Sequence, residues 1–156
     1  MPNYDFKKDL PIAVETEKEV AKILEERYNA NILEFSHTNK YDILAEIKNK
    51  KYTFEVKEDF TCEKTGNVGL EFRCRGKPSG IQTSQADFYI YKIHAQDGSI
   101  GFYLSKTSTL KKMIDDKKYF RIVNGGDVGS NSMNYLFKYE TFINNAKLIH
   151  LLLDKT

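Results

Sequence analysis

Two short segments decide the fold of this chain: Tyr41-Asp42-Ile43-Leu44-Ala45-Glu46-Ile47 and Tyr52-Thr53-Phe54-Glu55-Val56-Lys57-Glu58, with Lys48-Asn49-Lys50-Lys51 between them. Both alternate between apolar and polar residues, as strands with one buried face do, and the gap has the length of a hairpin turn. A turn at the middle of the gap places Asp42 opposite Lys57. The sequence therefore predicts an antiparallel hairpin over residues 41–58.

The predicted hairpin gathers three charged side chains on one face. Glu55 shares the face of Lys57, because side chains return to the same face at every second residue, and the pairing puts Asp42 there too. Opposed Cβ atoms lie about 5 Å apart and diagonal ones about 7–8 Å apart. Two carboxylates and an ammonium are then within reach of one small cation, whereas a register slipped by one residue would move Asp42 to the other face.

These residue types suit the cleavage of a phosphodiester bond. Two carboxylates hold a hard divalent ion such as Mg2+ or Mn2+, which lowers the pKa of a bound water and neutralises charge that builds on the phosphate. A lysine beside the ion orients or deprotonates that water, or holds a phosphate oxygen. The alternative is an amphipathic hairpin whose solvent face carries an ordinary Glu55 and Lys57.

A helix predicted from about Ile12 to Tyr28 supplies a further carboxylate. Its apolar residues recur at three- and four-residue steps, and Glu17 falls inside that stripe, whereas Glu15 and Glu19 rotate away from it. A carboxylate turned toward a core is costly unless it has a partner or a metal. The alternative is a glutamate at the edge of the stripe that reaches solvent.

Asp42, followed thirteen positions later by Glu55-Val56-Lys57 and preceded by an acidic helix, resembles the PD-(D/E)XK nuclease superfamily over about residues 12–91. The layout is most similar to the archaeal and phage Holliday-junction resolvase type; Tyr41 stands where the motif has a nominal proline. The resemblance implies a restriction-endonuclease-like fold and a metal-dependent nuclease acting on DNA. It also implies that Asp42, Glu55 and Glu17 hold the metal and that Lys57 is the catalytic lysine.

Basic residues follow the predicted hairpin. Val68 to Cys74 alternates as a strand, which we expect to join the hairpin, and Arg75-Gly76-Lys77-Pro78-Ser79-Gly80 then forms a turn with exposed N–H groups. We expect DNA phosphates to bind there, at Arg73, Arg75, Lys77 and Ser79. Glu71 is a candidate accessory ligand, or else a partner for a neighbouring arginine, and the turn is otherwise an ordinary solvated one.

The remaining segments complete a mixed sheet with helices on its faces. We predict a polar helix start at 82–85, strands at 88–93, 100–104 and 119–123, a helix capped by Ser105 or Thr107, and buried apolar segments at 135–139 and 148–153. Residues 124–132 form a long loop without the spacing of a Walker or dinucleotide motif, so no nucleotide cofactor is expected.

Composition is consistent with one enzyme domain. The chain has 156 residues, a net charge of +2 and two cysteines that form no paired motif. It has no apolar leader and no stretch long enough to span a membrane, so a cytoplasmic protein is expected.

The sequence thus predicts a single α/β nuclease domain over residues 1–156. We expect a Mg2+- or Mn2+-dependent deoxyribonuclease that cuts branched DNA, as a homodimer if two strands are to be cut. The alternatives are a restriction-type or exonuclease activity, a nucleic-acid-binding module with little or no catalysis, and a protein-interaction domain with a chance Asp and Glu-x-Lys.

Overall fold

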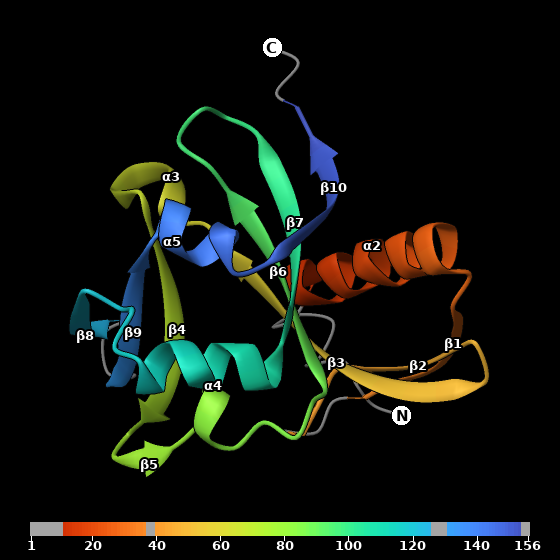
Figure 1. Cartoon of the computed structure of the whole chain (residues 1–156), viewed down its shortest axis with the longest axis horizontal. Helices are drawn as coiled ribbons and strands as arrows, with labels where there is room; N and C mark the ends of the chain where they lie inside the picture. Colours follow the sequence, from red (N-terminus) through yellow and green to blue (C-terminus); the bar gives the residue numbers. More distant parts are fainter. Residues whose placement is uncertain (1–10, 37–39, 126–130, 154–156) are drawn as a thin grey trace.

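The structure, a computed structural model, describes residues 11–36, 40–125 and 131–153. Figure 1 shows how its helices and strands are arranged. The described helices are α2 (Pro11–Tyr28), α3 (Cys62–Thr65), α4 (Thr107–Asp115), α5 (Tyr139–Asn144) and the 3-10 helix η1 (Gly80–Gln82). The strands are β1 (Asn31–Phe35), β2 (Ile43–Ile47), β3 (Lys50–Asp59), β4 (Asn67–Cys74), β5 (Lys77–Pro78), β6 (Phe88–His94), β7 (Ile100–Lys106), β8 (Arg121–Gly125), β9 (Ser132–Lys138) and β10 (Lys147–Leu152).

The predicted central mixed sheet is confirmed as a six-stranded sheet in the order β1-β2-β3-β6-β7-β10. Only the β3–β6 pair is parallel, and the other neighbours are antiparallel. The predicted helix is α2, with Pro11 at its first position, where a missing N–H costs nothing. Its apolar stripe, including Val20 and Leu24, packs against Phe54 and Ile90 on one face of the sheet.

A second core lies on the opposite face of the six-stranded sheet. Tyr91 and Ile93 of β6 pack there with Leu70 of β4, Leu110 of α4 and Phe137 of β9. Alternate residues of one strand therefore serve two cores, because successive side chains point to opposite faces. The chain is an α/β structure in which α2 and a second layer enclose the central sheet (Figure 1).

The expectation that the 68–74 strand joins the hairpin is wrong. This strand, β4, belongs to a separate four-stranded sheet in the order β5-β4-β9-β8, called here the second sheet. β3 pairs with β2 over its first half and with β6 over its second half, whereas β4 pairs with β5 and β9. Val68 and Leu70 are instead buried in the second core with Phe137.

The hairpin is confirmed, but its predicted register is wrong by two residues. Ile47 pairs with Lys50, so the turn consists of Lys48 and Asn49 alone, with φ values of 52° and 66°. Two successive left-handed residues make the hairpin turn whose twist matches that of the strands. A shift of two residues preserves the side-chain faces, so Asp42, Glu55 and Lys57 still share one face, with Asp42 opposite Glu55 instead of Lys57.

Three local predictions also need correction. No helix starts at residues 82–85, where the chain leaves η1 for an irregular segment. The predicted helix is α4, but it begins after Lys106 without a side-chain cap. The 148–153 segment forms β10, whose side chains are mostly exposed because β10 is an edge strand; only Ile149 is buried.

Two further expectations concern the loop at 124–132 and membrane spans. The first residues of that loop belong to β8 and the last one belongs to β9, and its middle lies outside the described residues.

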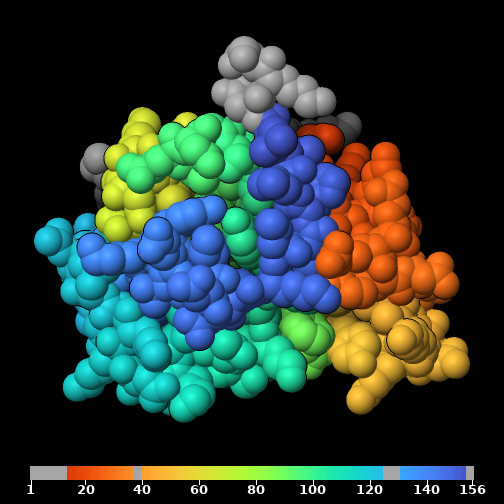
Figure 2. Space-filling view, turned by 45° about the horizontal axis from the view of Figure 1, so that its top comes forward, coloured from red at the N-terminus to blue at the C-terminus, as the bar shows by residue number. Residues whose placement is uncertain are grey.

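Figure 2 shows β10 in blue on the molecular surface, beside α2 in orange. None of the described helices combines the length and apolar character that a membrane span requires.

Candidate active site

Asp42 lies just before β2 and is fixed by both strands of the hairpin. Its backbone N–H donates to the carbonyl oxygen of Phe54 at 2.8 Å, and its Oδ2 accepts a hydrogen bond from the Val56 N–H at 2.8 Å. The carboxylate thus occupies the place that a backbone carbonyl would take if β2 continued. This contact holds the side chain beside β3 at the point where the two strands stop pairing.

Glu55 and Lys57 follow on the same face of β3. Lys57 Nζ lies 3.6 Å from Glu55 Oε2, and their side chains are 41% and 15% exposed, respectively. Burial raises the pKa of Glu55 to about 7; the nearby Lys57 lowers it and Asp42 raises it. Glu55 is therefore a buried carboxyl group between one ammonium and one carboxylate.

Glu17 reaches the same place from α2. Burial first, and then the charges of Asp42 and Glu55, raise its pKa to about 7. Its two acidic neighbours on the helix lie elsewhere: Glu15 is exposed, and Glu19 Oε1 is 2.6 Å from Lys92 Nζ. The structure thus brings Glu17, Asp42, Glu55 and Lys57 together, although three separate segments of the chain carry them.

The segment after β5 forms the wall opposite Glu55 and Lys57. A pocket of about 290 Å3 is lined by these two residues, by residues 78–80 and by Thr83 and Ser84. The Ser79 hydroxyl donates to Glu71 Oε2 at 2.8 Å, which engages the predicted accessory carboxylate. Gly80 has a φ of 52°, and a Cβ on it would lie 2.1 Å from the Glu71 carbonyl oxygen, so only glycine permits this approach.

The predicted DNA-binding residues divide into two groups. Ser79 lines the pocket with Glu55 and Lys57. Arg73, Arg75 and Lys77 are exposed around the tight β4–β5 turn and do not line that pocket. The structure therefore places these three cations at the periphery of the site.

Sequence reasoning missed Tyr89, which lies beside Glu55 in the parallel β3–β6 pairing. Tyr89 is fully buried, and burial raises the pKa of its hydroxyl well above the ordinary value, with added effects of Glu55, Asp42 and Glu71. A pairing between segments more than thirty residues apart leaves no local signal in the sequence. Tyr89 forms the base of the site.

A second polar cluster on the other face of the sheet was also missed. Glu58 Oε2 lies 2.7 Å from His94 Nε2 and 3.6 Å from Lys92 Nζ, and Glu58 Oε1 accepts a hydrogen bond from Thr16. Lys92 also pairs with Glu19. These contacts tie α2 to β3 and β6 and fix the strand that carries Glu55 and Lys57.

The acidic side chains of the site do not form a tight ligand cluster. Within residues 11–36, 40–125 and 131–153, no three Asp, Glu, His or Cys side chains converge closely enough to form a ready-made metal cluster. The carboxylates of Glu17, Asp42 and Glu55 are thus a looser group, linked by their mutual electrostatic effects. No family model, curated protein or solved structure matches this chain.

Proposed function

We propose that this protein is a metal-dependent deoxyribonuclease whose active site comprises Asp42, Glu55, Lys57 and Glu17. The observation that carries the proposal is the loose group of three carboxylates, Glu17, Asp42 and Glu55, beside an open pocket that Glu55 and Lys57 line, with Lys57 3.6 Å from Glu55. Phosphodiester cleavage calls for this combination, because charge develops on the phosphate and a water must be activated. The fold that accompanies this function is the restriction-endonuclease-like one.

The carboxylate set fits a hard divalent cation such as Mg2+ or Mn2+. Asp42, Glu55 and Glu17 offer oxygen ligands, the type that both ions prefer. The raised pKa values of Glu17 and Glu55 reflect burial together with repulsion between neighbouring carboxylates, which a cation would relieve. A bound ion supplies charge neutralisation and a more acidic water.

The residues of the protein orient the site and contact the substrate. Asp42 is preorganised by the Val56 N–H, so its carboxylate is already oriented before substrate binds. Lys57 extends into the pocket with 41% of its side chain exposed, where it meets a phosphate oxygen or the attacking water. Thr83 and Ser84 line the opposite wall, where Thr83 Oγ1 donates to the Gly80 carbonyl oxygen and Ser84 Oγ accepts from the Ala86 N–H, so the protein holds this wall in place.

Within this class we favour an endonuclease that prefers branched DNA and acts as a homodimer. Cutting two strands at symmetry-related positions requires two copies of a single-site domain, and a twofold dimer provides them. Support comes from the resemblance of the acidic helix and hairpin to junction-resolving nucleases. The exposed leucines of β10, Leu148, Leu151 and Leu152, offer a surface that such a dimer would bury.

A cleavage panel tests the proposal. Labelled duplex, single-stranded, flap, fork and four-way DNA are incubated with the protein in Mg2+, in Mn2+ or in EDTA, with Asp42→Asn as the inactive control. We expect metal-dependent internal cuts, fastest on branched DNA. Stepwise trimming from ends would indicate an exonuclease, and sequence-specific duplex cuts a restriction-type enzyme. DNA binding without any cleavage would leave a nucleic-acid-binding module and refute the nuclease assignment.

A further inference from the structure

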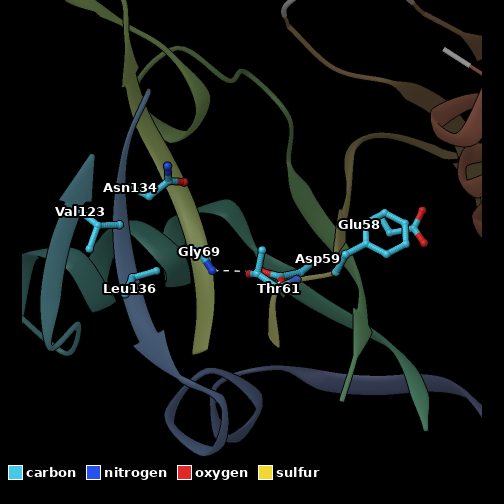
Figure 3. Close-up of a pocket in the computed structure, with 8 residues that line it drawn as sticks. Glu58, Asp59, Thr61, Gly69, Val123, Asn134 and Leu136 are labelled. Carbon is cyan, nitrogen blue, oxygen red and sulfur yellow. Dashed lines mark hydrogen bonds between the residues drawn. The ribbon is translucent and has the colours of Figure 1, made fainter. Parts of the chain in front are cut away.

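A second pocket lies farther along β3, beyond Lys57. It has a volume of about 370 Å3 and lies between Glu58–Thr61 at the end of β3 and the second sheet. Figure 3 shows Val123, Asn134 and Leu136 on one side of this pocket and Glu58 and Thr61 on the other. The proposed catalytic residues do not line it, so it is a separate feature of the same strand.

Phe60 gives this pocket a fixed aromatic surface. Its side chain is 46% exposed, and one face of the ring stacks on His94 with centroids 4.5 Å apart and an interplanar angle of 21°. His94 is held in turn by Glu58 at 2.7 Å. A large exposed aromatic side chain that is supported from behind is a platform on which a flat ring can stack.

The opposite side of the pocket offers a hydrogen-bonding amide over a rigid floor. Gly69 donates its N–H to Asp59 Oδ2 at 3.1 Å and accepts a hydrogen bond from the Tyr91 hydroxyl at 2.9 Å, so its backbone is fixed on both sides. A Cβ on Gly69 would lie 3.5 Å from Asn134 Oδ1. Within the described part of the chain, the Asn134 side chain forms no hydrogen bond, which leaves both a donor and an acceptor for a ligand.

The acidic residues of the pocket are already engaged. The Glu58 carboxylate turns toward α2 (Figure 3) and is contacted by Thr16 of α2 and by Lys92 and His94 of β6. Asp59 accepts hydrogen bonds from Thr61, Cys62 and Gly69. Both carboxylates are compensated within the protein, which reduces their repulsion of an anionic strand.

Cations lie on the same face of the second sheet as Asn134. Arg121 of β8 is directly opposite Leu136 of β9, and Lys138 follows Leu136 by two residues, so both share the face of Asn134. Arg121 and Lys138 also lie over the ring of the exposed Phe120, at 5.9 and 4.9 Å. An aromatic platform, an amide and nearby cations together match a base and its backbone phosphate.

We propose that this pocket binds an unpaired nucleobase of the substrate strand, stacked on Phe60 and hydrogen-bonded by Asn134. The inference rests on the proposed nuclease function, because the strand that enters the pocket is the one whose phosphate lies at Lys57. Phe60 follows Lys57 by three residues, just beyond the end of β3 at Asp59, so the substrate strand passes from Lys57 around the end of β3 to reach the ring that stacks on His94.

A fluorescent base analogue tests the proposal directly. Single-stranded and fork oligonucleotides carry one 2-aminopurine at successive positions, and the protein binds them in Ca2+ or EDTA without turnover. We expect quenching at one or two adjacent positions, and about tenfold weaker binding when that position is abasic, since stacking of one base on an aromatic side chain contributes about 1–3 kcal/mol.

Three variants assign the effect to the pocket. Phe60→Ala and Phe60→Leu should both abolish the position-specific quenching, and Phe60→Leu separates loss of stacking from loss of an apolar side chain. Asn134→Ala should retain quenching but weaken the preference for a base over an abasic site. Phe35→Ala on β1 is the matched control, because Phe35 is 43% exposed and lies outside the pocket. Circular dichroism verifies that each variant is folded.

The two proposals fail in different ways. If folded Phe60→Leu keeps the quenching and the base preference of the wild type, the nucleobase site is refuted, whereas Mg2+-dependent cleavage by the wild type would still support the nuclease. If the wild type quenches 2-aminopurine through Phe60 but never cleaves, the base-binding site stands and the catalytic proposal falls.

Discussion

The Asp42 carboxylate accepts a hydrogen bond from the backbone N–H of Val56, 2.8 Å away, at the place where β2 ceases to pair with β3. A substitution at Asp42 can therefore remove two things: the negative charge of the carboxylate and the hydrogen bond that links this residue to β3. Asparagine retains an acceptor oxygen for Val56 and removes the charge, whereas alanine removes both. The two substitutions separate catalysis from folding.

Asp42→Asn and Glu55→Gln should each abolish cleavage in Mg2+ while DNA binding in Ca2+ survives, because only stabilisation of the transition state loses its charge. Asp42→Ala should in addition lower the free energy of unfolding by about 1–3 kcal/mol, the cost of an unpaired buried donor. Single-turnover cleavage and urea denaturation measure the two effects. Glu46→Gln, on the same face of β2, is the matched control. Wild-type turnover in either Asp42→Asn or Glu55→Gln contradicts the metal assignment.

Lys57→Ala should slow cleavage by about 10²- to 10⁴-fold, the usual effect of losing a proton-transfer or charge-stabilising group. Arginine should restore little activity, because its guanidinium keeps the charge but does not act as a base and has another shape. Rates at saturating Mg2+ for the two variants check this, with the exposed Lys51→Ala as control. Full activity in Lys57→Arg would rule out the base role and leave an electrostatic one.

The face shared by Asp42, Glu55 and Lys57 was predictable because strand alternation depends only on parity. The real turn at Lys48 and Asn49 shifts the register by two residues and therefore leaves every side chain on its predicted face. The stripe of α2 likewise placed Glu17 toward the sheet, since helical periodicity is local.

Features that depend on distant pairings were not predictable. The alternation of Val68 and Leu70 indicates a strand but does not specify which sheet accepts it, and that choice depends on β9, far along the chain. The position of Tyr89 beside Glu55 and the pocket between Phe60 and Asn134 also arise only when remote segments pack together. Local patterns carry no information about such neighbours.

Glu17→Gln should reduce cleavage more than Glu15→Gln, because the charges of Asp42 and Glu55 act on Glu17, whereas Glu15 is exposed to solvent. Glu19→Gln should act mainly on stability, since Glu19 pairs with Lys92 at 2.6 Å. Single-turnover rates and melting temperatures, measured side by side, distinguish these effects. Equal and small losses of rate in the Glu17 and Glu15 variants would show that Glu17 has no part in cleavage and is an ordinary solvated residue.

The metal-free protein should lose stability as pH rises from about 4.5 to about 7. The pKa of Glu55 is raised from 4.5 to about 7 in the folded state, chiefly by burial, so the folded protein binds more protons than the unfolded chain in this window. Deprotonation on going to higher pH therefore favours unfolding, and Glu17 contributes in the same direction.

Glu55→Gln should flatten this pH dependence. In EDTA at pH 8 the variant should melt about 2–8 °C higher than the wild type, because it no longer buries a charge beside Asp42 and about 1 kcal/mol corresponds to roughly 2–4 °C in a chain of this size. Thermal denaturation from pH 4.5 to 8 measures the effect, and Glu46→Gln should follow the wild-type curve. A lower melting temperature for Glu55→Gln at pH 8 would show that the Glu55–Lys57 pair outweighs burial.

Replacing Arg75 and Lys77 together with alanine should weaken DNA binding and reduce the slope of log affinity against log salt by about one to two, as expected when one or two phosphate contacts are lost. Both side chains are exposed at the β4–β5 turn, outside the pocket of Glu55 and Lys57, so the cleavage rate of bound DNA should change little.

Lys111→Ala with Lys118→Ala provides the control for the loss of two exposed charges, since both lysines are exposed in or just after α4 and neither belongs to the β4–β5 turn. Binding titrations at several salt concentrations in Ca2+ give the slopes. Equal slopes for the wild type and the Arg75/Lys77 variant would show that the turn makes no contact with DNA phosphates. A reduced slope in the control pair alone would move the phosphate-binding surface to α4 instead.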